Sequence, residues 1–271
     1  MAYSNFKKTV WSNHIQRALE KACVLVEDCN REFEGEAKNG ARVKILGVTR
    51  PTIGTYAGTD IGAPEEVSDS SVMLEIDQAK FFNFGVDDVD KAQSVEGLLP
   101  ALLEESAAGL AQARDSYVAS LAVNAGKVFA SASVTTAAAA KQAVDAAFTW
   151  LWSKDVKVTD EVVIDVTPWF YNLFKEALTT LYTDNVELLR RGIVGMYNGA
   201  MVKISNNLHN DGTDDYLMVR TRRAVAFAGQ ISETEAYRPA GRFQDAVKGL
   251  DVYGAKVVRP NEMAAIKVHN S

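Results

Sequence analysis

Two stretches in the first third of the chain have the residue pattern of β-strands, and in the second of them the pattern has a period of two. The first stretch covers residues 41–47. The second begins near Ser71, where apolar side chains occupy every other position: Val72, Leu74 and Ile76. A period of two predicts a β-strand with one buried face. Residues 50–64, rich in Gly and Pro, lie between the stretches, and the second run continues towards Val86. We therefore expect two strands joined by a long irregular connection.

Such a two-stranded arm needs a surface to lie on. An isolated pair of strands is only marginally stable in water, because nothing covers its apolar face. A compact domain of the same chain could supply that surface, or a neighbouring copy of the chain could. The second possibility would make this an assembly protein.

Apolar residues spaced by three and four predict helices elsewhere. They indicate helices over residues 9–33, 98–124 and 137–152, and another that begins at Pro168. At ~1.5 Å per residue the second helix would be roughly 40 Å long, which is longer than most helices of globular domains. Thr135 or Thr136 would cap the third, and five residues mark its buried side: Val144, Ala147, Phe148, Leu151 and Trp152.

The second half of the chain mixes short strands with these helices. The pattern predicts a strand over 161–166, strand–turn–strand over 192–205, a polar loop over 206–215, a strand over 225–228, hairpin strands over 250–260 and a last strand over 264–268. The elements do not follow a strand–helix–strand rhythm, so the expected fold class is α+β.

Composition fits a globular protein without a membrane anchor. The 271 residues are 47% hydrophobic and 24% charged, which is ordinary for a folded domain. No apolar run reaches about 18 residues, and the first residues lack the apolar core of a signal peptide. Use in a cytoplasm is therefore expected. Cys23 and Cys29 match no metal or redox motif, and we expect reduced, buried thiols on different faces of the first helix.

The net charge of −6 is unevenly distributed. Residues 1–50 carry nine Lys and Arg against six Asp and Glu, whereas residues 51–120 carry three against thirteen. No concentrated basic face of the kind used to read DNA sequence is visible. The asymmetry suits contact between unlike surfaces of identical subunits, and it is equally consistent with a solvated acidic face.

Candidate chemistry is sparse. Asp87, Asp88 and Asp90 could bind a divalent metal, but at a strand-to-helix transition they are favoured as helix-capping residues. The loop at 211–215 lacks the spacing of a calcium site and is interpreted as a turn. His14, His209 and His269 lie far apart in the sequence. No catalytic motif emerges, although scattered residues can converge in space.

Three sequence segments, in their order along the chain, resemble segments of the major capsid proteins of tailed bacteriophages. They are residues 76–93, 192–208 and 249–260. The resemblance covers nearly the whole chain and implies the Hong Kong 97-like capsid fold. The shell proteins of encapsulins and the floor of herpesvirus capsids share this fold.

The resemblance also implies a division of the chain. An N-terminal arm would cover 1–40, an extended β loop 41–84, a long spine helix with its surroundings in the peripheral domain 85–129, an axial domain 130–235, and C-terminal strands of the peripheral domain 236–271. Because the arm begins near Met1, a separate scaffold protein, or none, is expected.

The implied function is that of a structural protein and not of an enzyme, with no cofactor and no metal. Many copies would form pentamers and hexamers that close an icosahedral shell around double-stranded DNA, bound without sequence specificity. Assembly would take place in the cytoplasm of the host bacterium, with portal, scaffold or decoration proteins as further partners of the virion. Candidate contacts between subunits are Trp11, Ile15, Tyr56, Ile61 and Pro64. An encapsulin-like compartment and a metal-dependent α+β enzyme are the alternatives.

Overall fold

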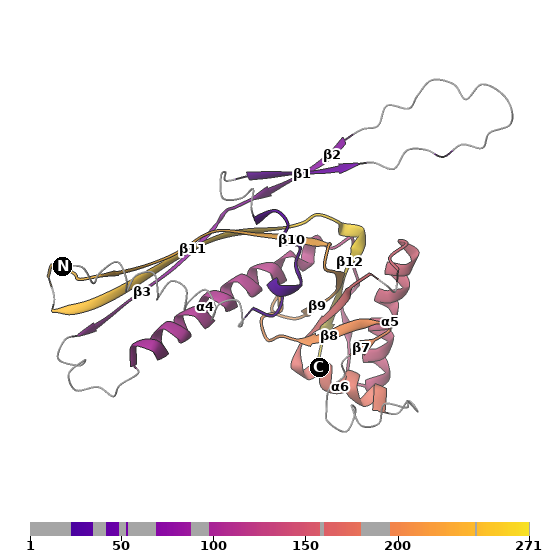
Figure 1. Cartoon of the computed structure of the whole chain (residues 1–271). Helices are drawn as coiled ribbons and strands as arrows, with labels where there is room; N and C mark the ends of the chain where they lie inside the picture. Colours follow the sequence, from indigo (N-terminus) through magenta and orange to yellow (C-terminus); the bar gives the residue numbers. More distant parts are fainter. Residues whose placement is uncertain are drawn as a thin grey trace, which may run out of the picture.

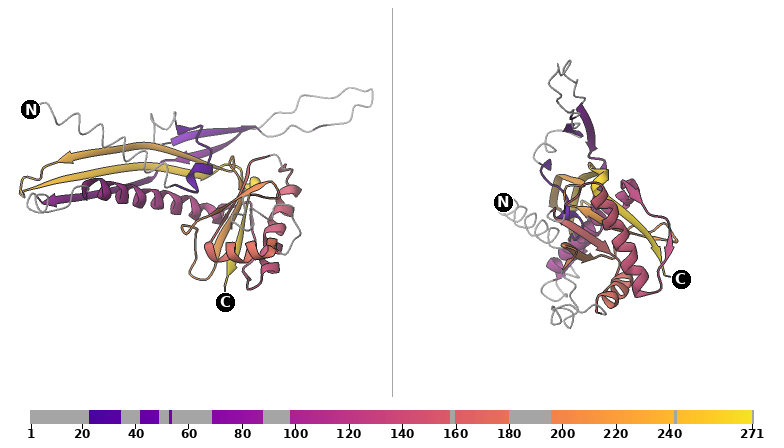
Figure 2. Two further views of the ribbon diagram at one scale, coloured as in Figure 1. Left: turned by 60° about the horizontal axis from the view of Figure 1, so that its bottom comes forward. Right: turned by 90° about the vertical axis from the view of Figure 1, so that its right-hand side faces the viewer.

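A long helix and a long three-stranded sheet run side by side through one half of the molecule (Figures 1 and 2). The computed structural model describes residues 23–34, 42–48, 53, 69–87, 98–157, 160–179, 196–241 and 243–270. Helix α4 (Leu98–Ser120) continues into the 3₁₀ helix η2 (Leu121–Asn124), which confirms the helix predicted over 98–124. The antiparallel sheet has the order β10 (Val225–Tyr237), β11 (Gln244–Val257), β3 (Gln78–Asp87).

The face of this sheet towards α4 is apolar. Val247 of β11 packs with Leu103 and Ala107 of α4, and Phe82 and Phe84 of β3 lie against the same cluster. Since side chains alternate along a strand, the residues between these positions point to the opposite, outer face.

A second, seven-stranded sheet forms the other half of the molecule. Its strands are β4 (Lys127–Val128), β12 (Met263–His269), β9 (Asp215–Thr221), β6 (Val162–Val166), β8 (Ala200–Ile204) and β7 (Met196–Tyr197) in spatial order, with β5 (Ala132–Ser133) also paired to β12. The 3₁₀ helix η3 (Pro260–Glu262) leads into β12. Together with the helices, the two sheets confirm the α+β class.

Helices α5 (Ala137–Ser153) and α6 (Pro168–Thr179) pack together beside this sheet (Figure 1). Thr136 caps α5 by accepting a hydrogen bond from the N–H of Ala139, as predicted. Phe148 and Leu151 are buried, but the assignment of Trp152 to the buried side was wrong, because 45% of this residue is exposed at the end of the helix.

The predicted two-stranded arm is confirmed. Strands β1 (Arg42–Val48) and β2 (Asp69–Glu75) are antiparallel and project away from the body (Figure 1). At the base of the arm a small cluster buries Val43, Ile45 and Leu74 against Ala226 and Ala228 of β10. The arm therefore rests on the outer face of the long sheet.

The prediction that the second strand of the arm continues to Val86 was wrong. The strand stops at Glu75, and after two residues the chain enters β3, in the long sheet. The break lies where the arm crosses Gly254 of β11. A Cβ atom on this glycine would be 2.1 Å from the carbonyl oxygen of Glu75, so the two backbones are in direct contact.

Two further predictions were also wrong. Residues 250–260 do not form a hairpin, because they lie mostly within the single strand β11. The helix predicted over 9–33 is absent from the described residues 23–33, where only a single 3₁₀ turn forms, η1 (Val26–Asp28). The domain boundaries implied by the resemblance stay a prediction.

Candidate assembly surfaces and their buried junction

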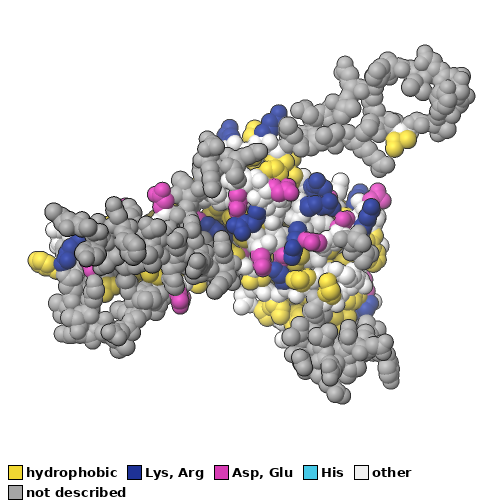
Figure 3. Space-filling view, viewed as in Figure 1, with side chains coloured by type: hydrophobic (Ala, Val, Ile, Leu, Met, Phe, Trp, Pro, Cys, Tyr) yellow, Lys and Arg dark blue, Asp and Glu magenta, His cyan; other side chains and the backbone are white. Residues whose placement is uncertain are grey.

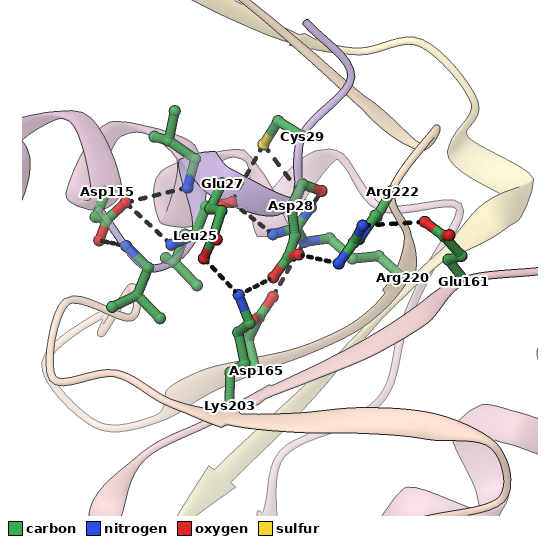
Figure 4. Close-up of polar contacts among 12 residues, drawn as sticks. Leu25, Glu27, Asp28, Cys29, Asp115, Glu161, Asp165, Lys203, Arg220 and Arg222 are labelled. Carbon is green, nitrogen blue, oxygen red and sulfur yellow. Dashed lines mark hydrogen bonds and ion pairs between the residues drawn. The ribbon is translucent and has the colours of Figure 1, made fainter. Parts of the chain in front are cut away.

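Residues 23–30, called the strap from here on, are held by side chains from distant parts of the chain (Figure 4). Asp115 on α4 accepts hydrogen bonds from three consecutive backbone N–H groups, those of Val24 (2.8 Å), Leu25 (3.1 Å) and Val26 (3.2 Å). Arg220 on β9 donates to the carbonyl oxygens of Asp28 (2.7 Å) and Leu25 (2.9 Å). Side chains of the body thus satisfy the groups that a helix would otherwise pair internally.

At the junction between the strap and the seven-stranded sheet, charged side chains are paired across three adjacent strands. Asp28, Asp165 and Arg220 are fully buried, whereas Lys203 and Arg222 are 16% and 43% exposed. Arg220 Nε lies 3.0 Å from Asp165 Oδ2 of β6, and both side chains are fully buried. Asp28 Oδ2 lies 2.6 Å from Lys203 Nζ of β8, and Oδ1 lies 3.0 Å from Arg222 Nη2. Neither Asp28 oxygen has a well-aligned hydrogen bond, so opposite charge at short range holds this carboxylate.

Burial dominates the electrostatics of the junction carboxylates. It raises the pKa of Asp115 although three backbone N–H groups act in the opposite direction. It also raises the pKa of Asp165, where the charge and hydrogen bond of Arg220 oppose it. Both groups therefore bind a proton more readily in the folded chain than in water.

A second buried ion pair joins α4 to the long sheet. Arg114 Nε donates to Asp251 Oδ2 of β11 over 2.7 Å, and Nη2 donates to the other carboxylate oxygen. The guanidinium carbon also lies 5.6 Å and 5.7 Å from the ring centroids of Phe227 and Tyr253. This pair fixes the helix against the inner face of the sheet.

Both cysteines lie in the strap. Cys23 and Cys29 are free and buried, as predicted, although no helix carries them in the part of the chain that the structure describes. Burial raises the pKa of Cys23 to about 12 and that of Cys29 to about 11. Because the thiolate is the reactive form, both thiols are inert while the strap is docked.

The outer face of the long sheet carries an exposed apolar pair. Phe81 of β3 and Leu250 of β11 are direct cross-strand neighbours, and they are 78% and 41% exposed. Nearby on this face, Lys248 Nζ lies 5.2 Å from the ring centroid of Tyr237 and 3.2 Å from Glu235 Oε2. An apolar pair in a polar setting is the composition expected of a contact surface.

A second exposed apolar pair lies at the edge of the seven-stranded sheet. Met196 of β7 and Met201 of β8 are cross-strand partners, 69% and 39% exposed. On the face seen in Figure 3, Lys and Arg side chains lie among Asp and Glu side chains. The described side chains on that face therefore form no patch of a single charge.

The inter-subunit contacts predicted from the sequence, Trp11, Ile15, Tyr56, Ile61 and Pro64, all lie outside the described residues and stay predictions. The same holds for Asp88 and Asp90. Asp87 ends β3, and within the described ranges no group of His, Cys, Asp or Glu is arranged to hold a metal ion.

The strap, its partners and the Phe81–Leu250 pair were missed by sequence reasoning. No motif marks the strap, because its partners are about 90 to 195 residues away. The alternation around Phe81 was visible, but the sequence does not reveal which face another element covers.

The loop at 211–215 is a turn, as predicted. Asp211 Oδ1 accepts hydrogen bonds from the backbone N–H groups of Thr213 (3.1 Å) and Asp214 (2.9 Å). These bonds lower the pKa of Asp211 to about 2.

Close by, Ser131, Asp214 and His269 converge without forming a catalytic triad. Ser131 Oγ and Asp214 Oδ1 lie 3.2 Å and 2.7 Å from the same ring nitrogen, Nδ1 of His269. A triad needs the nucleophile and the carboxylate on opposite ring nitrogens, so this cluster ties the end of β12 to two loops.

No protein-family model and no curated protein matches the sequence. No helix in the described ranges is long and apolar enough to span a membrane.

Solved structures do match. A chain from Mycobacterium phage Che8 is 32% identical, with 90% of each chain covered and a TM-score of 0.79. The capsid structure of the cyanophage P-SCSP1u matches with 16% identity, 86% and 84% coverage and a TM-score of 0.67. A virus-like particle from Pyrococcus furiosus matches with 11% identity, 98% and 100% coverage and a TM-score of 0.62. The latter two share the fold alone. With its likeness to the Che8 chain in both sequence and fold, the chain belongs to the major capsid proteins of tailed bacteriophages, which have the Hong Kong 97-like fold.

Proposed function

We propose that many copies of this chain, arranged as pentamers and hexamers, build an icosahedral shell that encloses double-stranded phage DNA. The observation that carries the proposal is the 32% identity to the Che8 chain over 90% of both proteins. The proposed role is structural, because the similar solved structures are capsids, which favours this role over that of a metal-dependent enzyme. The virion is the expected location, and assembly in the host cytoplasm with portal, scaffold or decoration proteins belongs to the same proposal.

The arm supports assembly because, among the described residues, contacts within the chain cover one face of its base and leave a side chain of the other face exposed. Val43, Ile45 and Leu74 are buried against β10, but Met73, on the other face of β2, is 44% exposed. A neighbouring copy can supply the missing surface. Obligate interfaces of this kind commonly bury on the order of 2,000–5,000 Å².

The Phe81–Leu250 pair offers a surface on the body for such a contact. Each exposed apolar pair is small, but a shell repeats every contact many times, and linked contacts strengthen one another through their high effective concentration. Contact with packaged DNA would be modest and independent of sequence, in line with the mixture of charges on the face seen in Figure 3.

The proposal is tested by the particle size of the purified chain, measured by light scattering and negative-stain microscopy. Closed shells tens of nanometres across, or rings of five and six, are the expected result, on the scale that many ~30 kDa copies produce. If the chain stays monomeric or dimeric both alone and with the other structural proteins of its phage, the proposal is wrong.

Deletion of residues 52–68 tests the arm. We expect a folded chain that fails to close shells, because the base of the arm keeps its contacts with β10. A matched control replaces the same residues by a Gly/Ser sequence of equal length, which keeps the span but removes Tyr56, Ile61 and Pro64. Normal particles from both variants would refute a role of this segment.

An encapsulin-like compartment is the alternative. The virus-like particle from Pyrococcus furiosus, which matches over 98% of this chain, shares its fold. Because the identity to this particle is only 11%, the compartment is less supported than the phage capsid. Purified particles distinguish them by content: packaged DNA supports the phage capsid, whereas a protein cargo without DNA supports the compartment.

A further inference from the structure

The strap lies where three parts of the molecule meet, and each part holds it separately. Asp115 binds it from α4, and Arg220 binds it from the seven-stranded sheet. The long sheet binds it through a pair of backbone hydrogen bonds: the N–H of Asn30 donates to Val225 O over 2.8 Å, and the N–H of Phe227 donates to Asn30 O over 2.9 Å. Displacement of the strap would therefore remove a connection that joins α4, the seven-stranded sheet and the long sheet.

The strap has almost no structure of its own. Its regular part is the three-residue turn η1, and one isolated bridge joins it to β10. Four of its side chains, Cys23, Leu25, Val26 and Cys29, are buried in the main core, and its other contacts with the body are polar. The strap is a short, contiguous segment whose anchoring contacts all come from the body, and contiguous segments of this kind open as local cooperative units.

Opening of the strap costs less than unfolding of the chain. The Arg220–Asp165 pair does not include the strap, so release of the strap does not by itself break this pair. Lys203 and Arg222 lose Asp28, but Arg222 keeps Glu161 at 3.1 Å, and water can reach the vacated groups. Local opening of this type has a free energy below that of global unfolding.

We propose that residues 23–30 form a strap that opens and closes as one unit and that, when docked, fixes the seven-stranded sheet against α4 and the long sheet. One consequence rests on the proposed function: identical chains in pentamers and hexamers occupy unlike surroundings, and a releasable strap lets the two halves of the molecule adjust before they are locked.

The two cysteines provide a direct test, because the chain has only these two and both lie in the strap. The full-length, unassembled chain is labelled with iodoacetamide at pH 8 over a range of urea concentrations. Mass spectrometry follows Cys23 and Cys29 separately, and circular dichroism follows global unfolding. We expect the free energy of opening derived from labelling to be the same at Cys23 and Cys29. This free energy should depend less steeply on urea concentration than the free energy of global unfolding.

The variant Asp28→Asn removes the charge that binds Lys203 and Arg222. We expect labelling of both cysteines to become about 10- to 100-fold faster, as for the loss of a buried charged contact. The matched control is Glu27→Gln, which changes the charge equally and touches the same Lys203 at 3.0 Å, but from a side chain that is 67% exposed. Exposed pairs contribute little, so its labelling should stay within about twofold of the wild type.

Two results would overturn the inference. One is labelling of the wild type with the urea dependence of global unfolding, which would mean that the strap does not open by itself. The other is acceleration of one cysteine by Asp28→Asn without the other, which would mean that the strap is not one unit. Should the variant fail to fold, the wild-type urea series still decides the question. None of these readouts requires a shell, so failure here is distinct from failure of the proposed function.

Discussion

Removal of the charge on Asp251 should destabilise the chain more than any single change at its surface. Asp251 and Arg114 form a two-point ion pair between β11 and α4, with side chains 0% and 9% exposed. Burial by itself would lower the pKa of Arg114, but the hydrogen bonds and charge of Asp251 outweigh it, so the pKa lies above its usual value. The arginine therefore stays charged in the folded chain, and the variant Asp251→Asn leaves that charge without its partner.

The expected loss follows from the cost of an unpaired buried charge, which is about 3–5 kcal/mol. Asparagine has nearly the shape of aspartate and can still accept one hydrogen bond, so we expect the lower end, about 3 kcal/mol. Chains of this size lose roughly 2–4 °C in Tm per kcal/mol, which corresponds to a decrease of roughly 6–12 °C.

Urea unfolding of the unassembled chain measures this loss. The matched control is Glu75→Gln, which removes the charge from the pair with Arg42, where the side chains are 54% and 68% exposed. Because water screens this pair, its expected cost is about 0–1 kcal/mol. A loss below about 1 kcal/mol for Asp251→Asn would refute the reasoning.

A double-mutant cycle provides a second check. Since a buried ion pair can be replaced by apolar residues at little cost, the double variant Arg114→Met with Asp251→Leu should be less destabilised than the sum of its single variants. Additive losses would show that the two side chains act independently.

Three other outcomes test the fold and its surfaces. Gly254→Val should displace the arm from the long sheet, because a Cβ atom there would lie 2.1 Å from a backbone oxygen of the arm. Limited proteolysis should then cut the arm faster. The control Gly109→Ala, with no atom within 4 Å of the added Cβ atom, should instead raise Tm through a helix propensity gain of up to ~1 kcal/mol. Phe81→Ser should leave the urea midpoint of the chain unchanged, since this side chain is 78% exposed, and microscopy should show fewer closed shells. The pKa of Asp211 is lowered to about 2, so its contribution to stability is present above about pH 4 and is lost as the pH falls through about 2. Because other carboxylates such as Asp214 also have a lowered pKa, a Tm series over pH should show a smaller decrease at low pH in Asp211→Asn than in the wild type.

Local patterns were sufficient to predict the elements whose stability is local. The stripe of α4, the cap of α5 at Thr136 and the alternation of β1 and β2 depend on residues close in sequence. A helix or strand of this kind can therefore be recognised before its neighbours are known.

The wrong predictions have causes that are distant in the sequence. Residues 250–260 suggested a hairpin, but they lie mostly in the single strand β11, and the arm crosses its backbone at Gly254. The apolar spacing of residues 23–33 suggested a helix, but Asp115 and Arg220 take its backbone N–H and C=O groups. Neither the crossing nor those side chains can be read from a local window.

The buried junction and the exposed apolar surfaces have different roles in assembly, because their contacts differ in physical character. Buried ion pairs such as Arg220–Asp165 fix one geometry, because a displacement of either partner leaves a desolvated charge. Exposed apolar pairs such as Phe81–Leu250 are non-directional and tolerate small shifts between neighbours. A capsid chain needs both properties: once the strap is docked, each subunit must keep its internal shape while its contacts adapt to rings of five and six. If this division holds, variants of the junction should alter the stability of the single chain, whereas variants of the outer face should alter only the yield of shells.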